Sequence, residues 1–164
     1  MACSSYCLTM WEQLRRYRAL DSSARKVFHR AVVLLPLISA SLRFAGFKKT
    51  QASLQRRLAG WAPAPARPAE VTERVTKTCR MVRAAAHYGM AGATCLEQSP
   101  ALWYLLGRQG ISSKLRIGVR KNEQQFEAHA WVEYAGAPLN QTDDSHHHYA
   151  AFENEFSVSP TEQP

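Results

Sequence analysis

Hydrophobic positions in the first 60 residues recur at the spacing of amphipathic helices. Apolar side chains return every three or four positions between residues 10 and 60, which predicts two or three helices. Pro36 is expected to kink or break this region, and Gly46 to end a helix before the next one begins. The candidate N-caps, all short polar residues ahead of an apolar run, are Asp21, Ser22 and Ser23.

A proline-rich stretch follows, and after it the helical period returns. Residues 61–70 read WAPAPARPAE, which is too stiff and too poor in backbone donors for a helix or a central strand. The next segment predicts one helix that ends near Gly89. Its apolar face, at steps of four, four, three and four, consists of Val71, Val75, Cys79, Val82 and Ala86.

The next predicted helix has two possible starting points. Thr94 with Glu97 three residues later is a capping-box pattern, and it places Cys95 in the first helical turn. A start at Ser99 with Pro100 as the first helical residue is the alternative, because proline is tolerated at that position. In either case a glycine at 107 or 110 supplies the C-terminal end.

Two alternating segments predict a β-hairpin. Leu115, Ile117 and Val119 alternate with polar residues, a turn follows at 121–125, and the alternation resumes from Phe126 to Val132. Polar loop and one short strand are expected after the hairpin. The opposite face of the second strand carries Glu127, His129, Trp131 and Glu133.

Length and charge refine this description. The 164 residues, 46% of them hydrophobic, suffice for one folded unit, with a helical region at 1–60, a linker at 61–70 and a core domain at 71–164. The net charge of +8 is divided unevenly, because residues 1–83 hold 16 Lys/Arg against 4 Asp/Glu and residues 84–164 hold 5 against 9. Such a basic half is typical of a solvated helical surface or of a surface for acidic partners.

Targeting and cysteine patterns favour the cytoplasm. The apolar stretch that starts at Ala31 is interrupted by Pro36 and closed by Arg43, so we expect no transmembrane segment, and the N-terminus does not resemble a signal peptide. Four irregularly spaced cysteines do not form a disulfide framework. Neither the Cys3/Cys7 pair nor the histidine run at 146–148 has zinc-site spacing, so we expect no metal, and no phosphate-binding glycine loop is present.

Cys95 and His129 are the candidate catalytic pair. A thiol in the first turn of a helix meets free backbone N–H groups and the positive end of the helix dipole, both of which favour thiolate. A cysteine nucleophile also requires an imidazole within hydrogen-bond reach. His129 would supply it if the helix that begins near Cys95 packs across the sheet; a structural role for this histidine is the alternative.

The run GATCLEQSPALWYLLGRQGISSKLRIGVRKNEQQFEAHAWVEYAGAPLN closely resembles the lasso-peptide leader peptidases, a bacterial family of transglutaminase-like cysteine proteases. It joins the family's Cys-Leu-Glu helix start, Leu-Arg-Ile-Gly-Val strand and Ala-His-Ala-Trp-Val-Glu strand in order, and the helical half resembles the family as well. The resemblance implies an α+β fold with a transglutaminase-like or papain-like core. It also implies Cys95 as nucleophile and His129 as general base and acid.

The third member of the implied triad departs from the family. The family's aspartate after the second strand matches Gln141 here, and a neutral amide oxygen still accepts from an imidazole N–H. Alternatively Asp143 fills the role and restores the charge, and this is the interpretation we favour; Asp144 is a further candidate. Trp131 and Glu133, beside the histidine, are candidates for shielding the pair and binding substrate, or for packing alone.

The implied function is removal of the leader from a ribosomally made lasso-peptide precursor, with no cofactor. The implied partners are the precursor peptide, a separate leader-recognition protein and a separate ATP-dependent lasso cyclase. Transglutaminase-like amide transfer or deamidation is an alternative, as is a non-catalytic peptide-binding scaffold. We expect no nucleic-acid function, because aromatic and basic residues do not interleave as they do in stacking surfaces.

Overall fold

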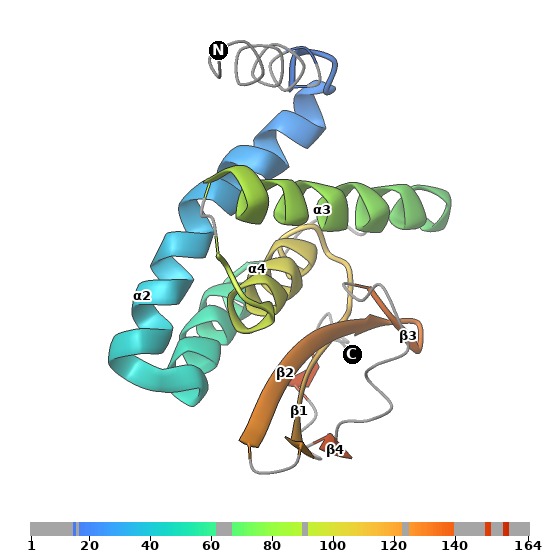
Figure 1. Cartoon of the computed structure of the whole chain (residues 1–164). Helices are drawn as coiled ribbons and strands as arrows, with labels where there is room; N and C mark the ends of the chain where they lie inside the picture. The colour runs from blue at the N-terminus through green and yellow to red at the C-terminus, as the bar shows by residue number, and fades with distance from the viewer. Residues whose placement is uncertain are drawn as a thin grey trace, which may run out of the picture.

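The computed structural model describes residues 15, 17–61, 67–89, 92–122, 125–139, 150–151 and 156–157. In the part of the chain from Ser22 onward that it describes, the fold is α+β, with helices α2, α3 and α4 on one side and a small antiparallel sheet on the other (Figure 1). Helix α4 (Cys95–Gly107) lies between the other two helices and the sheet, and it contacts all of these elements. The candidate nucleophile therefore belongs to the central element.

Helix α2 (Ser22–Ala59) consists of two helical segments joined at Gly46. Asp21, one of the three candidates, is the N-cap, and its Oδ1 accepts the backbone N–H of Ala24 at 2.6 Å. Gly46 adopts φ 79° and ψ 171°, a region open almost only to glycine, so the predicted helix end there is confirmed as a break. Pro36 does not break the helix, because it lies inside it with helical backbone angles, and the alternative of a kink there stays a prediction.

The length and hydropathy of α2 differ from the sequence-based expectation. Because the helix continues through Pro36, it contains an 18-residue window of mean hydropathy 1.5, long and apolar enough to cross a membrane by these two criteria. Only 17% of that window is buried. One face of the helix nevertheless packs against α3 and α4, as a core helix does, through Ala31, Leu35 and Ile38.

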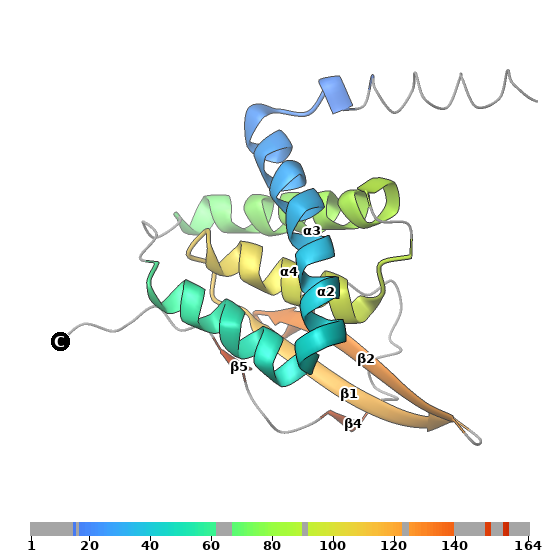
Figure 2. The same cartoon turned by 90° about the vertical axis from the view of Figure 1, so that its left-hand side faces the viewer.

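Helix α3 (Pro68–Gly89) begins inside the predicted linker. Pro68 is its first residue, a position where the missing N–H of proline is not needed, so the helix starts three residues earlier than the apolar pattern indicated. The predicted apolar face is confirmed, because Val75, Val82 and Ala86 are buried and packed into the core. Figure 2, turned by 90°, shows α3 and α4 behind α2.

The core of the molecule is built around α4. Leu102, Trp103 and Leu106 are almost completely buried, and the indole Nε1 of Trp103 donates to the carbonyl of Ser113 at 3.2 Å. Gly107, at the C-terminal end of α4, lies so close to Leu58 of α2 that a Cβ atom there would approach the leucine Cδ1 to 2.9 Å. The neighbouring elements complete the core with Leu35, Ile38, Val75, Val82, Leu115 and Val132.

The predicted hairpin is confirmed. Strand β1 (Lys114–Asn122) pairs antiparallel with β2 (Gln125–Tyr134), with Leu115 opposite Val132 and Gly118 opposite His129. After the hairpin the structure has three strands of two residues each. These are β3 (Ala137–Pro138), which pairs with β2, and β4 (Ala150–Ala151) and β5 (Phe156–Ser157), which both pair with β1.

Candidate active site

The start of α4 fixes the position of Cys95. Thr94 is the N-cap, with extended backbone angles of φ −82° and ψ 174°, and Cys95 is the first helical residue. The Glu97 carboxylate accepts the backbone N–H of Thr94 at 2.5 Å and its hydroxyl at 2.7 Å. The capping-box start is therefore confirmed and the alternative start at Ser99 is wrong. Pro100 is accommodated inside the helix, and Cys95 is partly buried.

Glu97 also connects this helix start to α2. Its Oε1 accepts the hydroxyl of Ser39 at 3.0 Å. Burial alone would raise the pKa of Glu97, but the hydrogen bonds from Thr94 and Ser39 outweigh it, and the pKa lies below its usual value. The group is thus a stable carboxylate in the first turn of α4, where a negative charge is favourable.

His129 lies on β2, next to a group of side chains that contact one another. Its ring stacks on the Trp131 ring, with centroids 6.0 Å apart and planes at 19°. Trp131 is 3% exposed and donates from Nε1 to one Glu133 oxygen at 3.0 Å, while the other oxygen accepts from Arg116 Nε at 3.0 Å. Trp131 therefore lies beside His129, and Glu133 contacts Trp131 rather than the histidine; their predicted role in binding substrate stays a prediction.

A buried hydrogen bond joins α4 to β2 next to both candidate residues. The Ser99 hydroxyl donates to the Ala130 carbonyl at 2.7 Å. Ser99 follows Cys95 by one helical turn and shares its side of the helix, where side chains four apart are about 6 Å apart. Ala130 directly follows His129 in the strand. The two elements that carry the predicted pair are thus joined at a point one helical turn from Cys95 and one residue from His129.

The residues that are candidates for the third member of the catalytic triad lie outside the part of the chain that the structure describes. Gln141, Asp143 and Asp144 lie outside the described residues, as do Cys3 and Cys7. The choice among the three triad candidates therefore stays a prediction.

Sequence reasoning missed three residues that shape this site. Ser99 was considered only as a possible helix start, although its position four residues after Cys95 indicated that the two share a helix face. Arg116 was not singled out, although alternation in the first strand places it on the face that meets Trp131. Gly118 is buried opposite His129, so β1 presents no side chain beside the imidazole at that position.

Cys79, the other cysteine in the described part of the chain, has a different environment from Cys95. Cys79 lies on the core face of α3, and burial raises the pKa of its thiol to about 11 although Arg83 is nearby. It therefore stays protonated near neutral pH and serves as a matched control for Cys95. Within the described part of the chain, no group of three or more His, Cys, Asp or Glu side chains is arranged to hold a metal ion.

Comparison with known proteins gives one match. A family model described as the transglutaminase-like superfamily matches residues 34–154, which include most of α2, all of α3 and α4, and the hairpin. The comparisons with curated proteins and with solved structures gave no match.

Proposed function

The chain belongs to the transglutaminase-like superfamily, and on this premise we propose that it is a cysteine peptidase that removes the leader from a lasso-peptide precursor. Cysteine-protease and transglutaminase chemistry are both found in this superfamily. The narrower assignment rests on the resemblance of the segment from Gly92 to Asn140 to the lasso-peptide leader peptidases.

One observation supports the catalytic assignment most directly. The buried Ser99–Ala130 hydrogen bond ties the first turns of α4 to the strand position next to His129. Cysteine–histidine catalysis requires an imidazole within hydrogen-bond reach of the thiol, and we propose that this link between helix and strand brings Cys95 and His129 within that reach. Trp131, whose ring is stacked with that of His129, would limit the rotation of the imidazole and shield one of its faces from water.

The proposed reaction proceeds through a thioester. The Cys95 thiolate attacks the carbonyl carbon at the leader–core junction, and the carbon–nitrogen bond breaks as His129 gives a proton to the departing amine. Water, deprotonated by His129, then cleaves the carbon–sulfur bond and releases the leader as a free acid. The first N–H groups of a helix have no partner within the helix, so the Cys95 N–H is the proposed oxyanion donor.

We assign the third position to Asp143, with Gln141 and Asp144 as the other candidates. A carboxylate would stabilise the imidazolium that forms during proton transfer, whereas the amide of Gln141 would orient the ring without a charge. The enzyme would act in the cytoplasm with a separate leader-recognition protein. The free α-amine of the core peptide would then pass to a separate ATP-dependent cyclase.

Mass spectrometry of a cognate precursor, incubated with this protein and the recognition protein, tests the proposal. We expect loss of a leader-sized mass, and at least about a 10³-fold lower rate for Cys95→Ala and His129→Ala. Cys79→Ala should cleave at the wild-type rate, because that thiol lies in the core away from His129. Whichever of Asp143→Ala and Gln141→Ala lowers the cleavage rate more identifies the third member of the catalytic triad.

The masses of the products also distinguish peptide-bond hydrolysis from the competing functions. Transfer of the acyl group to an amine leaves a product whose mass differs from that of the hydrolysis product by the amine less one water, and deamidation adds about one mass unit to an uncut precursor. The superfamily membership is equally compatible with these two outcomes. Binding of the precursor without any change in its mass would reject all of the catalytic functions and favour a scaffold.

A further inference from the structure

Helix α2 exposes an apolar stripe on the side opposite to its core face. Val33, Leu37 and Phe44 are 62%, 60% and 86% exposed. At about 100° of rotation per residue, these three positions lie within about 40° of one another. The buried positions Ala31 and Leu35 fall on the other side of the helix. Three large apolar side chains aligned in water are unusual for a surface helix.

Part of this stripe borders a groove between α2 and α4. The groove has a volume of about 410 Å³, and its lining includes Arg30, Val33, Leu34, Leu37, Tyr104 and Arg108. Tyr104 lies nine residues after Cys95, or about 14 Å along the helix axis. The groove is therefore at the opposite end of α4 from the candidate active site. Phe44 does not line it.

The charges around the groove have one sign. Among the described residues, its lining contains two arginines and no carboxylate, and α2 itself carries eight Lys/Arg and no Asp/Glu. Arg108 is held in place, because its guanidinium lies 3.8 Å from the centroid of the Trp61 ring and its Nη1 donates to the Tyr104 hydroxyl at 3.3 Å. A cation that is already ordered loses little side-chain entropy when it binds an anion.

We propose that this groove binds an acidic amphipathic helix of a partner protein. Two apolar side chains one turn apart would fill the space beside Val33 and Leu37, and carboxylates on either side of them would pair with Arg30 and Arg108. A second copy of this chain that docked through its own α2 is a poor occupant, because it would bring another eight cations toward the first eight. The concave shape favours an inserted helix over a flat lipid surface. This inference does not depend on the catalytic proposal.

Fluorescence anisotropy with a labelled synthetic peptide tests the proposal. The probe is a helix-forming peptide of about 16 residues with leucines one turn apart and glutamates on both sides of them. We expect the double variant Val33→Ser/Leu37→Ser to weaken binding at least about tenfold. Arg30→Gln should weaken binding about three- to tenfold and reduce its salt dependence.

Two matched variants on the same helix serve as controls. Phe44→Ser removes a more exposed apolar side chain outside the groove, and Arg43→Gln removes an exposed cation outside it. Both should bind the peptide within about twofold of wild type. Circular dichroism of every variant checks that the helices are retained.

Three results would overturn the proposal. The first is no peptide binding below millimolar concentration, and the second is binding that Val33→Ser/Leu37→Ser does not change. The third is binding to vesicles of phosphatidylcholine and phosphatidylglycerol that Phe44→Ser weakens as much as the double variant does. That last result would show that the whole stripe lies on a membrane surface.

Discussion

Two buried serines, Ser99 within α4 and Ser113 just before β1, differ in whether their hydroxyl groups have a hydrogen-bond partner. Ser99 donates to the carbonyl of Ala130, whereas the Ser113 hydroxyl is buried without a partner among the described residues. Removing a hydroxyl that donates to a buried carbonyl lowers the free energy of unfolding by about 1–3 kcal/mol. Removing a buried hydroxyl that has no partner instead removes the cost of burying that group.

We therefore expect opposite effects from the same substitution at these two sites. Ser99→Ala should lower the free energy of unfolding by about 1–3 kcal/mol, and Ser113→Ala should leave it unchanged or raise it by up to about 1 kcal/mol. Urea unfolding measures both. Equal losses of stability would show that the Ser99–Ala130 hydrogen bond does not join α4 to the sheet.

Single residues were predictable from the sequence where the interaction is local. Asp21 as N-cap and the Thr94–Glu97 capping pattern were found because both interactions span three residues. The contacts of Ser99 and Arg116 were missed because their partners, Ala130 and Glu133, lie 31 and 17 positions away. Such contacts depend on how the helix and the strands pack, which a short pattern does not encode.

At the scale of elements, the glycine and the proline in α2 have opposite roles. Pro36 stays helical, whereas Gly46 divides the helix. Thr50 holds the break together, because its hydroxyl donates to the Gly46 carbonyl at 2.8 Å and lies 2.8 Å from the Ser41 hydroxyl. The apolar positions around Pro36 are compatible with a continuous helix, and burial against α3 and α4 compensates for the lost backbone hydrogen bond.

Gly46→Ala should destabilise the protein although no atom outside the local backbone lies within 4 Å of the added Cβ. The cost arises from the backbone angles alone and amounts to about 1–3 kcal/mol of unfolding free energy. Thermal denaturation of this variant beside Gly60→Ala, whose φ of −83° is open to alanine, measures it. If both variants melt at the same temperature, the break is not at Gly46.

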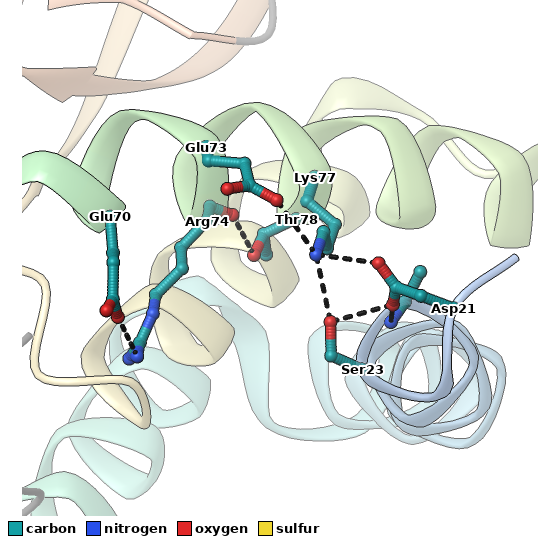
Figure 3. A network of polar contacts seen from close by, with 8 residues as sticks. Asp21, Ser23, Glu70, Glu73, Arg74, Lys77 and Thr78 are labelled. Atoms are coloured by element: carbon teal, nitrogen blue, oxygen red, sulfur yellow. Dashed lines mark hydrogen bonds and ion pairs between the residues drawn. The ribbon is translucent and has the colours of Figure 1, made fainter.

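At the scale of the whole molecule, an ion pair connects the start of α2 to the middle of α3. Lys77 Nζ lies 2.8 Å from Asp21 Oδ2 and also contacts Ser23 and Glu73 (Figure 3). The hydrogen bond from Lys77, followed by that from the Ala24 N–H, holds the pKa of Asp21 below its usual 3.8. The hydrogen bond with Asp21 raises the pKa of Lys77 above 10.5 against a smaller opposing effect of burial.

The pair should make global stability depend on pH at both extremes. Because the pKa of Asp21 is lowered on folding, its contribution is present above pH 3.8 and is lost as the pH falls toward the folded-state value. The contribution of Lys77 is present below pH 10.5 and is lost as the pH rises through its raised pKa.

Lys77→Met should flatten the decline of stability in acid, because the hydrogen bond from this lysine is the largest single cause of the lowered pKa of Asp21. Urea midpoints between about pH 2 and pH 7 measure the effect, and Lys48→Met, an exposed lysine of α2, is the control. The same acid slope for Lys77→Met and wild type would contradict the role of the pair.

The overall arrangement was partly predictable from the sequence. The order of helices followed by a hairpin, the break at Gly46 and the helix start at Cys95 follow from periodicity and capping. The central position of α4 did not, because its sequence shows an apolar helix without indicating which elements cover it. The contact of α4 with β2 beside His129 likewise depends on packing between segments that are distant in sequence.

The central position of α4 has a consequence for synthesis on the ribosome. Helices α2 and α3 leave the ribosome first, with Leu35, Ile38 and Val82 exposed until α4 and the hairpin are made. Partly made chains with such exposed surfaces are prone to aggregate, and they attract chaperones. The newly made protein should therefore acquire its tertiary structure late, after the strand that carries His129 has been released.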